Sequence, residues 1–286
     1  VSVGIGDDAA AIRFDHQRDS LIATDMLMEG VHFTFPPATP ELAGRKALAV
    51  NLSDIAAMGG RAIAAFISIA IPQNRGISFA QDVHRGVLDL ANEFDVVVAG
   101  GDTNSWKGPL VINVAIVGET LRERPILRSG AQPGDWLFVT GDLGGSLGGK
   151  HLNFQPRLRE VITLLEECDP RAMIDVSDGL AADLHHILNQ SHVGAILDSS
   201  RIPISQAAQQ QATAGRTALD RALSDGEDFE LLFTVSPEDG SRLVSDWSDS
   251  TPITWIGEVT VATGCWLKSP TGDCVELPPL GWTHSI

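Results

Sequence analysis

Aspartates recur along this chain beside glycine, serine, threonine, alanine and valine, with few basic residues near them. In "GIGDDAA", residues 4–10, Asp7 and Asp8 are adjacent. Others follow apolar runs directly, as Asp25 follows "LIAT" and Asp102 follows "VVVAGG". The chain must therefore fold with acidic groups at strand ends, where α/β proteins assemble sites on loops. The whole set is Asp7, Asp8, Asp25, Asp54, Asp102, Asp175, Asp178, Glu227 and Asp228.

Two interpretations of these aspartates are open. A single aspartate next to Gly or Ser often caps a helix or closes a turn, and Asp178 in "SDG" before "LAADLHHIL" fits an N-cap. For the set, convergence around a cation is favoured, because gathered carboxylates repel and are costly to bury unpaired. Oxygen ligands indicate several Mg²⁺ ions, and the absence of Cys or His clusters argues against zinc. Such ions suit phosphoryl transfer from ATP.

The net charge is consistent with that chemistry. The chain carries 37 acidic and 20 basic residues, a formal charge of −17. Nucleic-acid binding is disfavoured, because phosphate contacts need lysine and arginine. An anionic substrate would approach against this field unless the site supplied cations locally. The longest apolar run, "AAFISIAI" at 64–71, has strand length and falls short of the roughly 20 residues of a membrane span.

Strands and helices alternate irregularly, so α/β and α+β classes both fit. Gly, Pro or Asp bounds most β-type runs, and helical periodicity marks several longer segments. The expected strands are 20–24, 62–71, 96–101, 110–118, 136–141, 194–198, 229–235 and 253–259. The expected helices are 41–58, 78–94, 157–167, 179–190 and 237–247. We expect the C-terminal segment "VELPPLGWTHSI" to be extended and to pack on the surface of the rest of the chain.

A length of 286 residues favours two domains. The polar, turn-rich stretch 122–135 separates them, so we expect domains at 1–121 and 122–286. The three cysteines, Cys168, Cys265 and Cys274, form no CxxC pair and are expected as free thiols. We expect a cytoplasmic protein: no signal peptide is visible, although the chain opens on Val1 rather than Met.

The motifs, taken in order, resemble those of the thiamine-monophosphate kinases. This family belongs to the superfamily that includes aminoimidazole ribonucleotide synthetase and selenophosphate synthetase. The resemblance runs from residue 4 to about residue 284. "GDDAA" and "SDG" occur across the superfamily, whereas the combination of "VHF", "NLSDIAAMGG" and "SDGEDFEL" is more specific. The other matching motifs are "TDMLMEGVHF", "GGDT", "LRSGAQPGD" and "IDVSDGLAADL".

The resemblance implies a fold and an activity. It implies Mg²⁺-dependent transfer of a phosphoryl group from ATP directly to thiamine monophosphate, giving thiamine diphosphate. It also implies a homodimer, in which an N-terminal domain binds metal and ATP and pairs through its sheet. A C-terminal α/β domain covers the nucleotide and the substrate in this family.

The resemblance also assigns residues to roles. Asp54, Asp102 and Asp178 match its catalytic positions. The magnesium ligands of the family match Asp8, Thr24, Asp25, Asp54, Asp102, Asp175 and Asp178. Its nucleotide contacts match Gly101, Arg128 and Ser177, and the positions that hold the thiamine end match His32, Glu227 and Trp282.

The residue types suit this chemistry. A phosphate monoester has a second pKa near ~6, so at neutral pH it is already a nucleophile and needs no catalytic base. Arg128 can grip a phosphate with its fork of donors. A flat, cationic thiamine end suits stacking on Trp282 and a carboxylate at Glu227.

Other interpretations remain open. "GGSLGGKH" at 144–151 nearly spells a P-loop, but His151 replaces the Ser or Thr that would bind Mg²⁺, which favours a glycine-rich turn near the phosphates. Ala23 stands where a hydroxyl often precedes Thr24, the loop at 147–157 is short for the family, and the chain has no tyrosine. One alternative is therefore a non-catalytic metal-binding homologue.

A second alternative is another ATP-using member of the superfamily, acting on a purine precursor or in hydrogenase maturation. Selenophosphate synthetase is disfavoured, because it needs a reactive Cys or selenocysteine near its N-terminus and residues 1–30 contain no cysteine.

Overall fold

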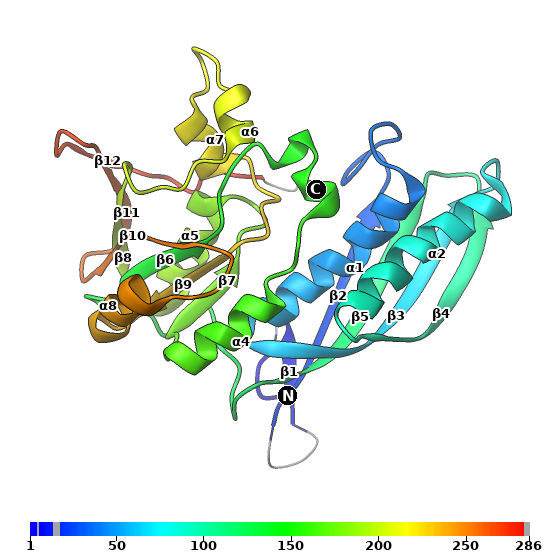
Figure 1. Cartoon of the computed structure of the whole chain (residues 1–286), viewed down its shortest axis with the longest axis horizontal. Coiled ribbons are helices and arrows are strands. Elements are labelled where there is room, and N and C mark those ends of the chain that lie inside the picture. Colours follow the sequence, from blue (N-terminus) through cyan, green and yellow to red (C-terminus); the bar gives the residue numbers. More distant parts are fainter. Residues whose placement is uncertain (5, 14–17, 283–286) are drawn as a thin grey trace. The chain divides into compact units, whose positions relative to one another are not determined.

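The computed structural model describes residues 1–4, 6–13 and 18–282. The chain divides into two compact units. The first comprises Val1–Pro125 and Leu152–Leu158, and the second comprises Ile126–His151 and Arg159–Ile286. The described part of each unit contains one sheet with helices against it, which confirms the expected mixed α and β class (Figure 1). Within the described ranges, no helix is both long and apolar enough to span a membrane.

The described strands of the first unit form a sheet in the order β1-β2-β5-β3-β4. Strands β3 and β4 are parallel, and the other neighbours are antiparallel. Helices α1 and α2 pack on each other and on one face of this sheet (Figure 1). The bounds are β1 Ala10–Ile12, β2 Ser20–Met28, α1 Pro40–Ala57, β3 Gly60–Pro72, α2 Gly76–Glu93, β4 Val97–Trp106 and β5 Val111–Thr120.

Helix α1 is the buried element of this unit. It begins after Thr39, whose hydroxyl oxygen accepts a hydrogen bond from the Leu42 N–H at 3.2 Å, and Pro40 occupies the first turn. Leu48 and Leu52 are fully buried. On β5, buried and half-buried residues alternate along the whole strand, so one face of the sheet lies under the helices.

The described strands of the second unit form a sheet in the order β12-β11-β8-β10-β6-β9-β7. The strand bounds are β6 Trp136–Thr140, β7 Ala172–Asp175, β8 Gly194–Asp198, β9 Leu231–Val235, β10 Ile253–Thr260, β11 Gly264–Lys268 and β12 Cys274–Glu276. Helix α3, Lys150–Asn153, crosses the division between the units after His151, and α4, Leu158–Glu167, begins on the last residue of the first unit. The other helix bounds are α5 Leu180–Ser191, α6 Gln206–Gln210, α7 Ala218–Ser224 and α8 Pro237–Asp246, with a 3-10 turn at Ser146–Gly148.

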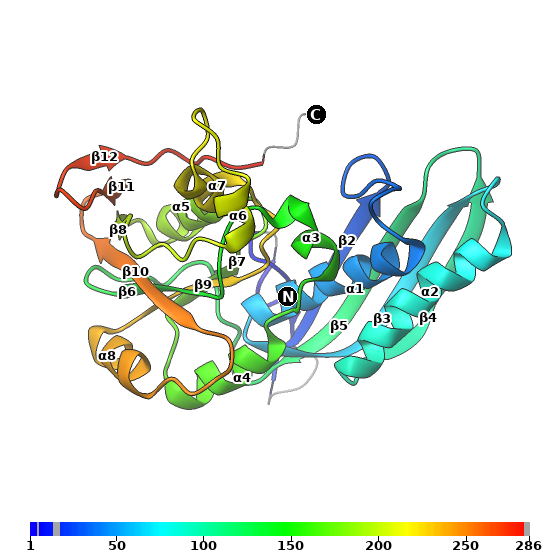
Figure 2. The same cartoon turned by 45° about the horizontal axis from the view of Figure 1, so that its top comes forward.

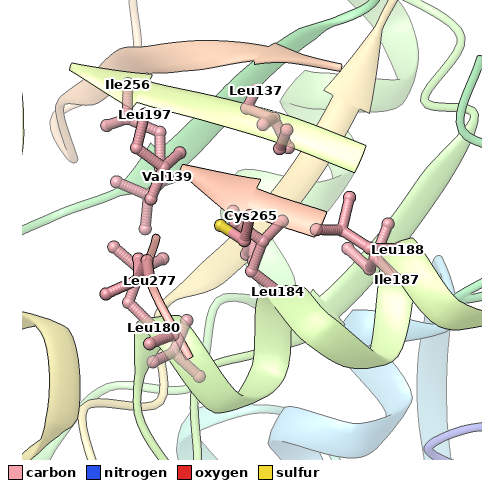
Figure 3. Close-up of a cluster of buried hydrophobic side chains, with 14 of the residues drawn as sticks. Leu137, Val139, Leu180, Leu184, Ile187, Leu188, Leu197, Ile256, Cys265 and Leu277 are labelled. Carbon is pink, nitrogen blue, oxygen red and sulfur yellow. The ribbon is translucent and has the colours of Figure 1, made fainter. Parts of the chain in front are cut away.

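Two helices cover opposite faces of this second sheet. Leu137 and Val139 of β6 join Leu184 of α5 in a buried apolar cluster (Figure 3). The alternate residue Trp136 lies against Gly240 of α8. Helix α8 lies on the other side of the sheet from α5 (Figure 2). This packing leaves the loop between β7 and α5 and the turn between α7 and β9 to build the candidate site in this unit.

Most predicted elements are confirmed within a few residues, including the long helices α1, α2, α4, α5 and α8. The prediction missed the short strands β1, β7, β11 and β12 and the short helices α3, α6 and α7. The tail begins in β12, and its Leu277 is buried in the core of the second unit; residues 283–286 lie outside the described ranges. All three cysteines are described, and none forms a disulfide.

Candidate functional site

Three acidic side chains converge in the first unit from separate parts of the chain. Asp8 precedes β1, Asp25 lies on β2 and Asp54 lies near the end of α1. Carboxylate oxygens of Asp8 and Asp54 lie within 4.8 Å of each other, and the side chains of Asp25 and Asp54 share a hydrogen bond. We call Asp8, Asp25 and Asp54 the acidic group.

The electrostatics of the acidic group suit an oxygen-preferring cation. Burial raises the pKa of Asp25 above its usual value, although the hydrogen bond to Asp54 opposes that shift. The neighbouring charge of Asp8 raises the pKa further. These carboxylates repel one another without a cation, and carboxylate oxygens are the donors that Mg²⁺ prefers. The donor set therefore fits Mg²⁺.

Strand alternation explains how Asp25 reaches α1. Leu21 and Ala23 are buried in one row of β2, and Asp25 is the next residue of that row. Because α1 packs on β2, this row faces the helix that carries Asp54. Ala23 thus lies buried beneath α1 and supplies no hydroxyl to the acidic group.

Thr24 and Asp102 lie on the opposite face of this sheet. The hydroxyl oxygen of Thr24 accepts a hydrogen bond from Asn113 of β5 at 3.1 Å. Asn113 is in register with Ser68 of β3, which is in register with Asp102 of β4. Three strand spacings separate Asp25 from Asp102, about 14 Å. The structure therefore does not bring these two predicted ligands to the acidic group.

His32 is held by the elements that carry the acidic group. Its Nδ1 accepts a hydrogen bond from the Met28 N–H at 3.0 Å, so the proton of the neutral ring lies on Nε2. Lys46 of α1, fully buried, donates from Nζ to the His32 carbonyl at 2.7 Å. Helix α1 thus positions both Asp54 and His32.

In the second unit, four predicted residues meet through their backbones. The Glu227 N–H donates to the Ser177 carbonyl at 2.7 Å, and the Trp282 N–H donates to the Asp178 carbonyl at 2.9 Å. Asp175, at the end of β7, is buried just before this loop. These residues form a second cluster of predicted metal and substrate contacts.

Asp183 completes this cluster, although the acidic pattern of the sequence did not point to it. Its carboxylate accepts hydrogen bonds from the N–H groups of Asp178 and Gly179, both at 3.0 Å. Burial raises its pKa well above the usual value, and the charges of Asp175 and Asp178 add to that shift. Its position in the first turn of α5 was the available signal, because acids there often bind free N–H groups.

Gly101 and Arg128, the two remaining residues predicted to contact the nucleotide, lie in different units. Gly101 is on β4 in the first unit. Arg128 is in the second unit, where its carbonyl accepts a hydrogen bond from the Ser191 hydroxyl at 3.4 Å.

The glycine-rich stretch after β6 does not form a P-loop. Its 3-10 turn leads only into α3, a helix of four residues, whereas a P-loop opens a longer helix. Lys150 Nζ donates to the buried Glu230 at 2.8 Å and to the Asp142 carbonyl at 2.9 Å. Burial lowers the pKa of Lys150, but the attraction of Glu230 outweighs it and the pKa lies above its usual value. Lys150 is therefore the half-buried partner of a buried carboxylate in an ion pair.

Two family models match this chain. The model described as AIR synthase related protein, N-terminal domain, matches residues 6–120, and the corresponding C-terminal domain matches residues 132–265. A thiamine-monophosphate kinase of Rhodopirellula baltica is 43% identical over 99% of this chain and 92% of its own length.

Solved structures also resemble the chain. The structure of "AaThiL complexed with AMPPCP and TMP" superimposes with a TM-score of 0.85 at 32% identity, over 98% of this chain and 92% of that one. The hydrogenase maturation protein HypE in complex with ATP has a TM-score of 0.78 at 20% identity, over 96% and 88% of the two chains. At that identity the likeness to HypE concerns the fold alone.

Proposed function

The chain belongs to the thiamine-monophosphate kinase family within the AIR synthase related proteins and is a kinase, and we propose that it phosphorylates thiamine monophosphate. In this proposal the γ-phosphoryl group of ATP passes directly, in line, to the phosphate of thiamine monophosphate, with Mg²⁺ bound. The products are thiamine diphosphate and ADP.

The convergence of the acidic group carries this proposal. Asp8, Asp25 and Asp54 come from distant parts of the sequence and meet around a position suited to a divalent cation. Magnesium bound there would neutralise phosphate oxygens. The resemblance to a kinase solved with an ATP analogue and TMP supports the identity of the two substrates.

The remaining predicted ligands divide into two further sets. We propose that Asp175 and Asp178 hold metal from the second unit, with Asp183 fixing the backbone of their loop. The side chains of Thr24 and Asp102 face away from Asp25, so they could ligate only a separate ion on the other face of the first sheet.

The substrate contacts follow from the same reasoning. We propose that Glu227 binds the thiamine end through its carboxylate and that Trp282, 57% exposed, stacks on it. His32 presents a proton on Nε2 and can donate a hydrogen bond. Gly101, Arg128 and Ser177 are proposed nucleotide contacts. The phosphate acceptor needs no general base, because it is already deprotonated at neutral pH.

The proposal extends to assembly and location. We propose a homodimer through the face of the first sheet that the helices leave exposed, where Met26 and Phe66 are 56% and 44% exposed. We also propose that the protein works in the cytoplasm, because its phosphoryl donor is ATP.

Metal removal tests the proposed activity. Purified protein with ATP and thiamine monophosphate should form thiamine diphosphate and ADP in equal amounts. EDTA should abolish both products, and excess Mg²⁺ should restore them, because the acidic group repels unshielded phosphates. Liquid chromatography of the products measures this. ADP formation that does not depend on thiamine monophosphate would contradict the proposal, as would full activity in EDTA.

A further inference from the structure

Glu227 has a backbone conformation that its own side chain disfavours. Its φ is +55°, and that of Phe229, two residues later, is +51°. Left-handed conformations are unfavourable for residues with a Cβ atom, and they persist only where surrounding contacts impose them. Glu227 is half-buried, whereas Asp228 after it is buried.

Two hydrogen bonds impose this conformation. The Glu227 N–H donates to the Ser177 carbonyl at 2.7 Å. The Glu227 carbonyl accepts a hydrogen bond from the Ser146 hydroxyl at 2.5 Å. Ser146 is 1% exposed and lies in the glycine-rich loop 141–149. Both backbone polar atoms of Glu227 are therefore fixed from outside its own turn.

The loop that supplies Ser146 is itself anchored. The Gly144 N–H donates to both carboxylate oxygens of Asp228, at 3.0 and 2.9 Å, and the Ser205 hydroxyl donates to the Gly144 carbonyl at 2.5 Å. The Gly145 N–H donates to Asp225 at 2.9 Å. Helices α7 and α6 pack closely against these two glycines. A Cβ on Gly144 would lie 2.6 Å from a backbone nitrogen of α7, and a Cβ on Gly145 would lie 2.5 Å from one of α6. The hydroxyl of Ser146 is thus held at a fixed place.

We propose that Ser146 is a positioning residue for Glu227. Its hydroxyl holds the Glu227 backbone in the left-handed conformation that sets the direction of the Cα–Cβ bond, and so of the carboxylate. This inference rests on the proposed role of Glu227 in binding the thiamine end. Through Ser146, the glycine-rich loop determines the affinity for the phosphoryl acceptor without touching it.

The test compares Ser146→Ala with Ser205→Ala. Both variants remove a buried hydroxyl that fixes the glycine-rich loop: Ser146 lies in the loop and donates to the Glu227 carbonyl, whereas Ser205 donates to the Gly144 carbonyl. We expect Ser146→Ala to raise KM for thiamine monophosphate about five- to tenfold, the effect of one lost hydrogen bond, with KM for ATP changed less than about twofold. Ser205→Ala should leave both KM values near those of the wild type, whatever it does to Tm.

A second background tests whether the effect passes through Glu227. In Glu227→Ala, adding Ser146→Ala should raise KM for thiamine monophosphate by less than about twofold, because coupled residues are not additive. Equal KM changes in Ser146→Ala and Ser205→Ala, or a full effect of Ser146→Ala in the Glu227→Ala background, would overturn the inference. So would an unchanged KM in Glu227→Ala.

A structural measurement separates this inference from the proposed function. Hydrogen exchange of a peptide covering residues 225–230 should be faster in Ser146→Ala than in Ser205→Ala. If the protein does not phosphorylate thiamine monophosphate, the proposed function fails, and the exchange result alone decides whether Ser146 holds Glu227. Equal exchange in both variants would refute the positioning role.

Discussion

At the scale of single residues, surroundings give aspartates of the same chain different chemistry. Asp25 shares a hydrogen bond with Asp54 and lies near Asp8, a combination that suits a cation. Asp183 instead accepts two backbone N–H groups, and Asp228 accepts one with both oxygens. The first arrangement suits metal binding, whereas the other two fix loops.

Asp54→Asn tests the acidic group. The amide keeps the shape of the side chain but removes a charge, so we expect kcat to fall at least about 100-fold through loss of metal-assisted transfer. Tm should not fall, because the substitution relieves repulsion with Asp8. Product formation and thermal unfolding measure the two effects.

Asp82→Asn is the matched control for that variant. Asp82 lies on α2 in the same unit and pairs with Arg85 at 2.7 Å on the surface, where an ion pair contributes little. Asp82→Asn should keep kcat within about twofold of the wild-type value. Near-normal kcat in Asp54→Asn would remove Asp54 from the proposed magnesium ligands.

Residue patterns predicted part of this site. The lack of basic neighbours in the sequence singled out Asp8, Asp25 and Asp54, because such charges need a partner from elsewhere in the fold. The pattern could not show Ser146, whose partner Glu227 is 81 residues away. The family resemblance, not the pattern, placed Thr24 with Asp25 among the magnesium ligands, and adjacent strand residues point to opposite faces.

At the scale of elements, the length of a helix or strand determined whether the sequence could predict it. Helices of ten or more residues, such as α2 and α4, have a periodic apolar face that the sequence displays. Strand β7 has four residues and α6 has five, too few to show a period. Helix α7 depends on its capping box at Thr217 and Asp220 rather than on an apolar stripe.

Hydrogen bonds join the loop 141–149 and the turn 225–230 into one unit whose stability should depend on pH. Burial raises the pKa of Asp228 to about 7, although the charge of Lys150 and the Gly144 N–H oppose the shift. The folded protein therefore binds this proton more tightly than the unfolded chain. The resulting stabilisation is complete below about pH 4 and is lost as pH rises through about 7.

Asp228→Asn should remove this dependence. Asparagine does not titrate, and its carbonyl oxygen can still accept the Gly144 N–H. Between pH 4 and pH 8, the free energy of unfolding of Asp228→Asn should rise relative to that of the wild type by up to about 4 kcal/mol. Urea denaturation at several pH values measures the difference.

The control for this experiment is Asp246→Asn, at the exposed end of α8. This variant should follow the wild-type pH dependence throughout. If Asp228→Asn also followed it, the buried carboxyl would not be the titrating group.

At the scale of the whole molecule, each unit has its own sheet and core, and the described helices of the first unit pack on one face of its sheet. Helices α1 and α2 pack on the face that includes Leu21, while the other face exposes Met26 of β2 and Phe66 of β3. Edge strand β4 adds Val97, which is 62% exposed. Exposed apolar side chains gathered on one face are typical of an interface between protein chains.

Phe66→Asp tests whether that face joins two copies. A charge at the centre of an apolar interface must be desolvated, so the variant should be a monomer where the wild type is a dimer. Light scattering after size-exclusion chromatography measures the mass. Ile77→Asp is the control, because Ile77 is 78% exposed on α2 on the other side of the sheet; it should remain dimeric. A monomeric wild type, or a dimer that survives Phe66→Asp, would exclude this face as the interface.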